Sequence, residues 1–155
     1  MRHMFWSGFW AFIIDQASKY LVMYPLDLIH KQAVDVFPPF LVFRMGLNDG
    51  INFGLFSGGS LMRWVWILVG LGLSFLVYRW VKSDGAPTFA QIFGGMLIGG
   101  ALANVSDRIV HGAVVDFLNM SCCGINNPYI FNLADVFIFI GAFGLILWPM
   151  WQKET

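Results

Sequence analysis

The feature that most constrains this chain is a series of long apolar segments. A helix that crosses a bilayer needs about 20 mainly apolar residues. Four segments meet this requirement, at about residues 4–24, 61–81, 87–106 and 129–151. We therefore expect an all-α integral membrane fold with four transmembrane helices, in a single domain of residues 1–155.

The composition supports a membrane protein over a soluble one. Hydrophobic residues make up 58% of the chain and charged residues only 12%, whereas soluble domains carry about 25% charged residues. The formal net charge is zero, which removes the basic surface that nucleic-acid binding needs. We therefore expect lipid contact and no nucleic-acid partner.

Two of the three connections between the apolar segments are long. Between the first and second segments, residues 33–57 contain Pro38-Pro39, a β-compatible run at 40–43 and the turn-rich Asn48-Asp49-Gly50. This pattern predicts a small β-containing region on the membrane surface. Basic residues divide evenly between the two sides, so the positive-inside rule leaves the orientation open.

Alternating the helix directions places four acids on one membrane face: Asp15, Asp107, Asp116 and Asp135. An ionisable group at membrane depth costs roughly 2.5–3.5 kcal/mol on insertion scales, so a cluster of such groups indicates a functional site. Asp15 and Lys19 are spaced i, i+4 and can neutralise each other, which is a structural alternative. Asp107 has an arginine beside it, whereas Asp116 and Asp135 lie in apolar surroundings without a local cation. The last two are therefore the strongest candidates for chemistry.

Two carboxyl groups in a low-dielectric site share one proton. An ionised aspartate can take a proton from water while a protonated one polarises a carbonyl, which suits peptide hydrolysis. Other chemistries lack their motifs, because Cys122 and Cys123 are adjacent and each histidine is isolated. We assign the cysteines no catalytic role, and expect a membrane aspartyl hydrolase without a metal.

The motifs resemble those of bacterial lipoprotein signal peptidase, also called signal peptidase II, over nearly the whole chain. They occur in the order of that family: Asp15-Gln16-Ala17-Ser18-Lys19, Asn48-x-Gly50-x-x-Phe53, residues 99–104 followed by Asp107-Arg108, Val114-Val115-Asp116-Phe117, and Phe131-Asn132-Leu133-Ala134-Asp135. The resemblance implies that Asp116 and Asp135 are catalytic. It also implies that Asn104, Asp107 and Arg108 brace the site and contact the substrate. Asn132 would line the site. Asp15 and Lys19 would support the loop that contains Asn48 and Gly50.

The same resemblance implies a reaction and a location. The enzyme would cleave a prolipoprotein signal peptide before a cysteine that carries diacylglyceryl, at the outer surface of the bacterial inner membrane. Both termini would lie in the cytoplasm, and residues 33–57 would lie outside it. No organic cofactor is implied, globomycin would inhibit the enzyme, and the glycines at 95 and 99 favour packing within a monomer over dimerisation.

The chain departs from the family pattern at four positions: Ile51, Asn52, Ala103 and Val136. We expect changed substrate preference or inhibitor affinity there rather than lost chemistry. A non-catalytic membrane protein that binds lipid or another ligand, with structural buried acids, is the alternative. A proton-coupled transporter fits less well, because the acids gather on one side of the membrane.

Overall fold

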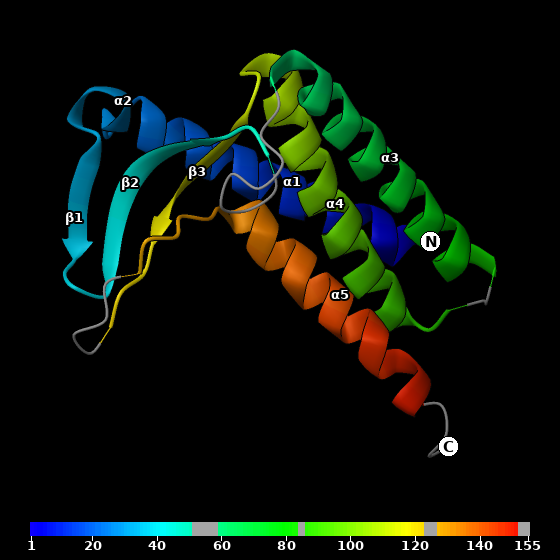
Figure 1. Cartoon of the computed structure of the whole chain (residues 1–155). Coiled ribbons are helices and arrows are strands. Elements are labelled where there is room, and N and C mark those ends of the chain that lie inside the picture. Colours follow the sequence, from blue (N-terminus) through cyan, green and yellow to red (C-terminus); the bar gives the residue numbers. More distant parts are fainter. Residues whose placement is uncertain (51–58, 84–85, 123–126, 152–155) are drawn as a thin grey trace.

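The computed structural model describes residues 1–50, 59–83, 86–122 and 127–151. Helices account for most of these residues, and a small sheet accounts for the rest of the regular structure (Figure 1). The helices are α1 (Arg2–Met23), α2 (Leu28–Lys31), α3 (Gly59–Ser83), α4 (Thr88–Val110) and α5 (Leu133–Trp151). The strands are β1 (Ala33–Phe37), β2 (Leu41–Asn48) and β3 (Val114–Asn119).

The architecture is mostly helical with a small sheet, as expected, but the expectation of four transmembrane helices stays a prediction. Among the described residues, α3 and α4 are long and apolar enough to cross a membrane, with mean hydropathies of 1.8 and 1.4. Two expected boundaries were wrong. Helix α4 continues to Val110, so Asp107 lies inside its last turn, and α5 begins only at Leu133 because the preceding residues pair with the sheet.

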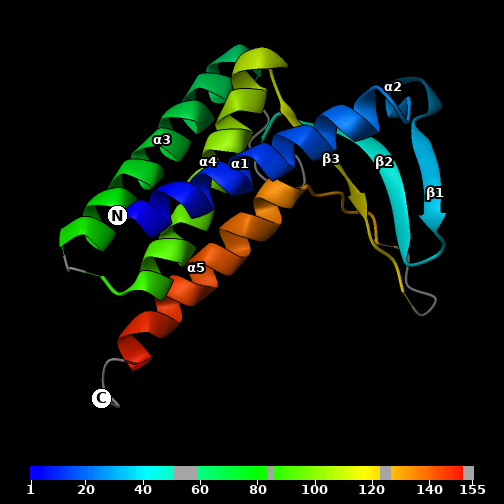
Figure 2. The same cartoon turned by 180° about the vertical axis from the view of Figure 1, so that it is seen from behind.

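The helix α4 forms the centre of the helical region. It packs against α1, α3 and α5, and Figures 1 and 2 show these three helices arranged around it. The sheet extends from one end of the helices. Both termini lie away from the sheet in the two views (Figures 1 and 2).

The sheet draws strands from both long connections. β2 pairs antiparallel with β1 on one side and with β3 on the other. β1 and β2 confirm the β-containing region expected between residues 33 and 57, of which residues 51–57 lie outside the described ranges. The strand β3 was not expected, because the apolar run Val114–Phe117 is too short for periodicity to decide its structure.

Glycines allow α4 to approach its neighbours at backbone distance. A Cβ added to Gly99 would lie 2.2 Å from the carbonyl oxygen of Gly8 in α1, and one added to Gly95 would lie 2.3 Å from that of Met4. On the opposite side, a Cβ on Gly100 would lie 2.5 Å from the carbonyl oxygen of Ala134 in α5. The small-residue motif around Gly95 and Gly99 therefore serves packing within the chain.

We predict that Gly99→Ala destabilises the protein by about 1–3 kcal/mol, because α1 and α4 must separate to admit the methyl group. Gly72→Ala is the matched control, since a Cβ at Gly72 in α3 meets nothing within 4 Å and alanine favours a helix. Thermal unfolding in detergent micelles measures both variants. Equal unfolding temperatures for the Gly99 variant and the unaltered protein would contradict this packing.

Candidate active site

The candidate catalytic aspartates come from neighbouring elements, β3 and α5. Phe131 pairs with Leu118 of β3, donating to its carbonyl oxygen at 3.0 Å and accepting from its amide at 2.8 Å. This pairing holds the chain beside the strand just before α5 begins. Asp116 in the strand and Asp135 in the first turn of the helix are thereby brought to one site.

Asn132 begins α5 with a reciprocal cap. Its side-chain Oδ1 accepts from the amide of Asp135 at 3.0 Å, and the carboxylate of Asp135 accepts from the amide of Asn132 at 3.3 Å. This is the geometry of a capping box, with aspartate in place of the usual glutamate. One arrangement therefore starts the helix and fixes the candidate catalytic carboxyl.

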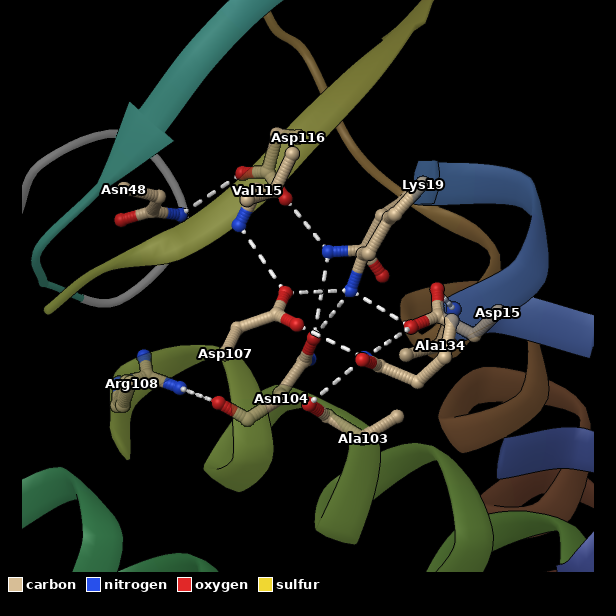
Figure 3. A network of polar contacts seen from close by, with 12 residues as sticks. Asp15, Lys19, Asn48, Ala103, Asn104, Asp107, Arg108, Val115, Asp116 and Ala134 are labelled. Carbon is tan, nitrogen blue, oxygen red and sulfur yellow. Dashed lines mark hydrogen bonds and ion pairs between the residues drawn. The ribbon is translucent and has the colours of Figure 1, made fainter. Parts of the chain in front are cut away.

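Two side-chain amides join the two carboxyl groups. Asn132 Nδ2 donates to Asp116 Oδ1 at 2.5 Å and to Asn104 Oδ1 at 3.3 Å. Asn104 Nδ2 in turn donates to Asp135 Oδ1 at 3.0 Å. Figure 3 shows Asn104 on α4 and Asp116 on β3 within the surrounding polar contacts. Asn104 and Asn132 therefore hold both carboxyl groups by hydrogen bonds.

The environment of Asp116 favours its protonated form. Its side chain is buried, with 3% of the residue exposed. Burial and, to a smaller extent, the negative charge of Asp135 raise the pKa of Asp116 to about 7, although the hydrogen bonds from Asn48 and Asn132 act in the opposite direction. A carboxyl with this pKa exchanges its proton near neutral pH, as a general acid or base must.

The end of β2 closes the other side of Asp116. Asn48 Nδ2 donates to Asp116 Oδ2 at 3.1 Å, and the Gly50 amide donates to Asn48 Oδ1 at 3.2 Å. Arg108 connects this turn to α4, donating to the carbonyl oxygens of Gly50 at 2.8 Å and Asn104 at 3.3 Å. The residues predicted to support the site therefore surround the pair in space.

A second buried cluster consists of the cation Lys19 between the acids Asp15 and Asp107. Lys19 Nζ is 2.6 Å from Asp15 Oδ2 and 2.7 Å from Asp107 Oδ2. Asp15 also accepts from the amide of Ala134 in α5 at 2.7 Å, and Asp107 accepts from the amide of Val115 in β3 at 3.1 Å. The cluster thus links α1, α4, β3 and α5.

The resemblance implied that Asp15 and Lys19 support the loop with Asn48. Within the described ranges, their side-chain contacts to other elements go to α4 and α5 instead. Asp15 and Lys19 therefore brace the helices, and the contact of Lys19 with Asp107 connects them to the site. The expectation of a self-contained i, i+4 pair was incomplete, because Asp107 is a second partner of the lysine.

Sequence reasoning missed Gln16 as a supporting residue. Its Nε2 donates to Asp107 Oδ1 at 2.8 Å and lies 3.4 Å from the Ala103 carbonyl oxygen. The residue stands inside the motif that contains Asp15, which was the available signal. Its role depends on which side of α1 faces α4, and a single polar residue in an apolar helix does not reveal this.

Ala103 and Val136, two of the four departures from the family pattern, lie among the described residues. Ala103 is fully buried, and Val136 lines a cavity beside Asp135. Ile51 and Asn52 lie outside the described residues, as does Cys123. Cys122 is disulfide-bonded, which agrees with assigning it no catalytic role.

The two acids are reached through different openings. Asp116 lines a cavity of about 180 Å³ with Asn48 and Tyr129. Asp135 lines a groove of about 300 Å³ formed by α3, α4 and α5. In the described part of the chain, no group of three or more His, Cys, Asp or Glu side chains is arranged to hold a metal ion. The arrangement is suited to general acid–base chemistry by a carboxyl pair.

We predict that Lys19→Met strongly destabilises the protein, by about 3–5 kcal/mol, because it leaves two buried carboxylates without their cation. Lys82→Met is the control, since Lys82 is exposed at the end of α3. Chemical unfolding in detergent compares the two variants. Equal losses of stability in both would show that the buried cluster does not brace the fold.

Comparison with known proteins places this geometry in context. The family model described as "Signal peptidase (SPase) II" matches residues 8–151. A lipoprotein signal peptidase of Pelagibacter ubique is 38% identical over 141 residues, covering 88% of this chain and 81% of the relative. Another from Methylorubrum extorquens is 37% identical over 135 residues, covering 86% of this chain and 77% of the relative.

A solved structure has the same fold. This bacterial membrane enzyme superposes with a TM-score of 0.82 at 26% sequence identity, covering all of this chain and 91% of the other. The family model covers far more than half of the chain, and the relatives match most of its length. The chain therefore belongs to the signal peptidase II family.

Proposed function

We propose that the chain is an aspartyl endopeptidase that removes the signal peptide from diacylglyceryl-modified prolipoproteins by cleaving before the lipidated cysteine. Asp116 and Asp135 are its catalytic residues. The main support for the proposal is a hydrogen-bonded link between the two carboxyl groups, formed by the side-chain amides of Asn104 and Asn132. Membership of the signal peptidase II family supports the substrate class.

In the proposed reaction the two carboxyl groups share one proton and titrate as a pair. The ionised carboxyl takes a proton from water while the water oxygen attacks the scissile carbonyl carbon. The protonated carboxyl polarises the carbonyl oxygen and passes it a proton. Collapse of the tetrahedral intermediate breaks the C–N bond. A hydroxyl of the intermediate returns its proton to the ionised carboxyl, and the leaving nitrogen takes a proton from the other carboxyl, which restores the singly protonated pair. No metal or organic cofactor takes part.

The supporting residues act on the pair without exchanging its protons. Asn104 and Asn132 fix the carboxyl oxygens, Asn48 holds the free side of Asp116, and Arg108 fixes the turn at Gly50. Asp107 positions β3 through the amide of Val115. A carboxyl pair held in this way needs little reorganisation during the reaction.

The surface of the helices supports a proposal for their placement in the membrane. We infer that α1, α3, α4 and α5 all cross the bacterial inner membrane as a single domain of residues 1–155. The outer faces of α1 and α5 support this, because large apolar side chains such as Phe5, Trp10, Phe139 and Phe143 are exposed there. A lipid-bearing substrate then enters laterally from the bilayer.

The orientation in the proposal places both termini in the cytoplasm. The start of α1 and the last turn of α5 lie away from the sheet (Figures 1 and 2). Asp116 belongs to that sheet, which supports a site near the outer surface. The glycine contacts of α4 occur within one chain and support a monomer. Globomycin is the inhibitor expected to occupy the site.

We predict that Asp116→Asn and Asp135→Asn each lower kcat by about 10²–10⁴-fold, because asparagine keeps the shape of aspartate but carries no exchangeable acidic proton. Mass spectrometry of a diacylglyceryl-modified precursor peptide, incubated with the enzyme in nanodiscs, measures the cleavage. Asp35→Asn is the control, since Asp35 is exposed on β1. Full activity in either site variant, folded as judged by thermal unfolding, overturns the assignment.

A further inference from the structure

The groove of about 300 Å³ between α3, α4 and α5 changes in character along its length. One end is polar and includes Asn104, Arg108 and Asp135. The remaining walls are largely hydrocarbon: Val69, Leu73, Leu97, Ala101, Ile138 and Phe139. The groove therefore leads from Asp135 of the proposed catalytic pair into an apolar channel between the helices.

Two hydrogen-bond donors of this groove lack partners. The indole Nε1 of Trp66 and the Nε of Arg108 are buried, and neither has a hydrogen-bond acceptor among the described residues. Both residues line the groove. The other nitrogens of Arg108 donate to Asn104 and Gly50, so its Nε is the guanidinium position still available.

A buried unpaired donor is costly, so native proteins rarely keep one. The Arg108 guanidinium is already fixed by its two other contacts, and Trp66 has its bulky ring in the wall of the groove. Two such donors in one groove indicate a ligand that brings acceptor oxygens. The apolar walls indicate that the rest of this ligand is hydrocarbon.

We propose that Trp66 is a positioning residue that donates, with Arg108 Nε, to an ester carbonyl of the substrate's diacylglyceryl group, while the acyl chain lies along the groove. This inference rests on the proposed function. Its chemistry is that of an acyl ester, which offers carbonyl acceptors and brings no donor of its own. A peptide segment would also bring N–H groups, for which the hydrocarbon walls have no acceptor.

The role of Trp66 is to place the lipid, and through it the adjacent scissile bond, against Asp135. Its loss therefore affects recognition of the ester rather than proton transfer. A free membrane phospholipid carries the same ester chemistry, so the test separates the two sources. It compares a peptide bearing a diacylglyceryl cysteine with the same peptide bearing the dialkyl ether analogue, which lacks both carbonyl groups.

We expect Trp66→Phe to lower kcat/KM for the ester peptide about three- to tenfold, which is the effect of one lost hydrogen bond. The same variant should leave kcat/KM for the ether peptide unchanged. Trp64→Phe is the matched control, because Trp64 lies on the same helix with its ring exposed, and it should affect neither substrate. The assays use the full chain in nanodiscs.

Three results with the Trp66→Phe variant would overturn the inference. Equal loss for both peptides assigns Trp66 to packing alone, and no loss for either leaves it without a role. If the effect of Trp66→Phe depends instead on whether the nanodisc lipids are ester- or ether-linked, the groove holds a free lipid. Each of these leaves the proposed function intact if the Asp116 and Asp135 variants are inactive. Failure of the unaltered enzyme to cleave the ester peptide overturns both proposals.

Discussion

The buried ion cluster of Lys19, Asp15 and Asp107 is the interaction on which the rest of the structure depends. Each carboxylate in it also accepts a backbone amide, from α5 in one case and from β3 in the other. An exposed pair would contribute little, but removing one member of a buried cluster leaves an uncompensated charge. The cluster therefore fixes the relative positions of the two elements that carry Asp116 and Asp135.

Close helix packing and the polar network depend on each other. The glycines of α4 let α1 and α5 approach at backbone distance, which brings Lys19 within reach of Asp107 and Asn104 within reach of Asp135. The network then satisfies the polar groups that this approach buries. Asn104 in α4 and Asn132, just before α5, hold the two carboxyl groups by hydrogen bonds.

The sequence was sufficient to single out Asp116 and Asp135, the proposed catalytic residues, but it did not predict the contacts that hold them in place. Asp116 and Asp135 stand out because each lies in apolar surroundings without a local cation, and the length of the apolar segments predicts the helices. The strand β3, the role of Gln16 and the link between Lys19 and Asp107 depend on contacts between segments far apart in the chain. Local periodicity carries no information about such contacts.

The central claim is that Asp116 and Asp135 form one carboxyl pair in which Asp116 holds a proton near neutral pH. Infrared spectroscopy of the protonated carboxyl band, recorded as the pH is varied, tests this directly. We predict a band that is lost as the pH rises through about 7, is absent in Asp116→Asn, and titrates at lower pH in Asp135→Asn because the neighbouring negative charge is gone. A band that still titrates near 7 in Asp116→Asn, or is unmoved in Asp135→Asn, would contradict the account.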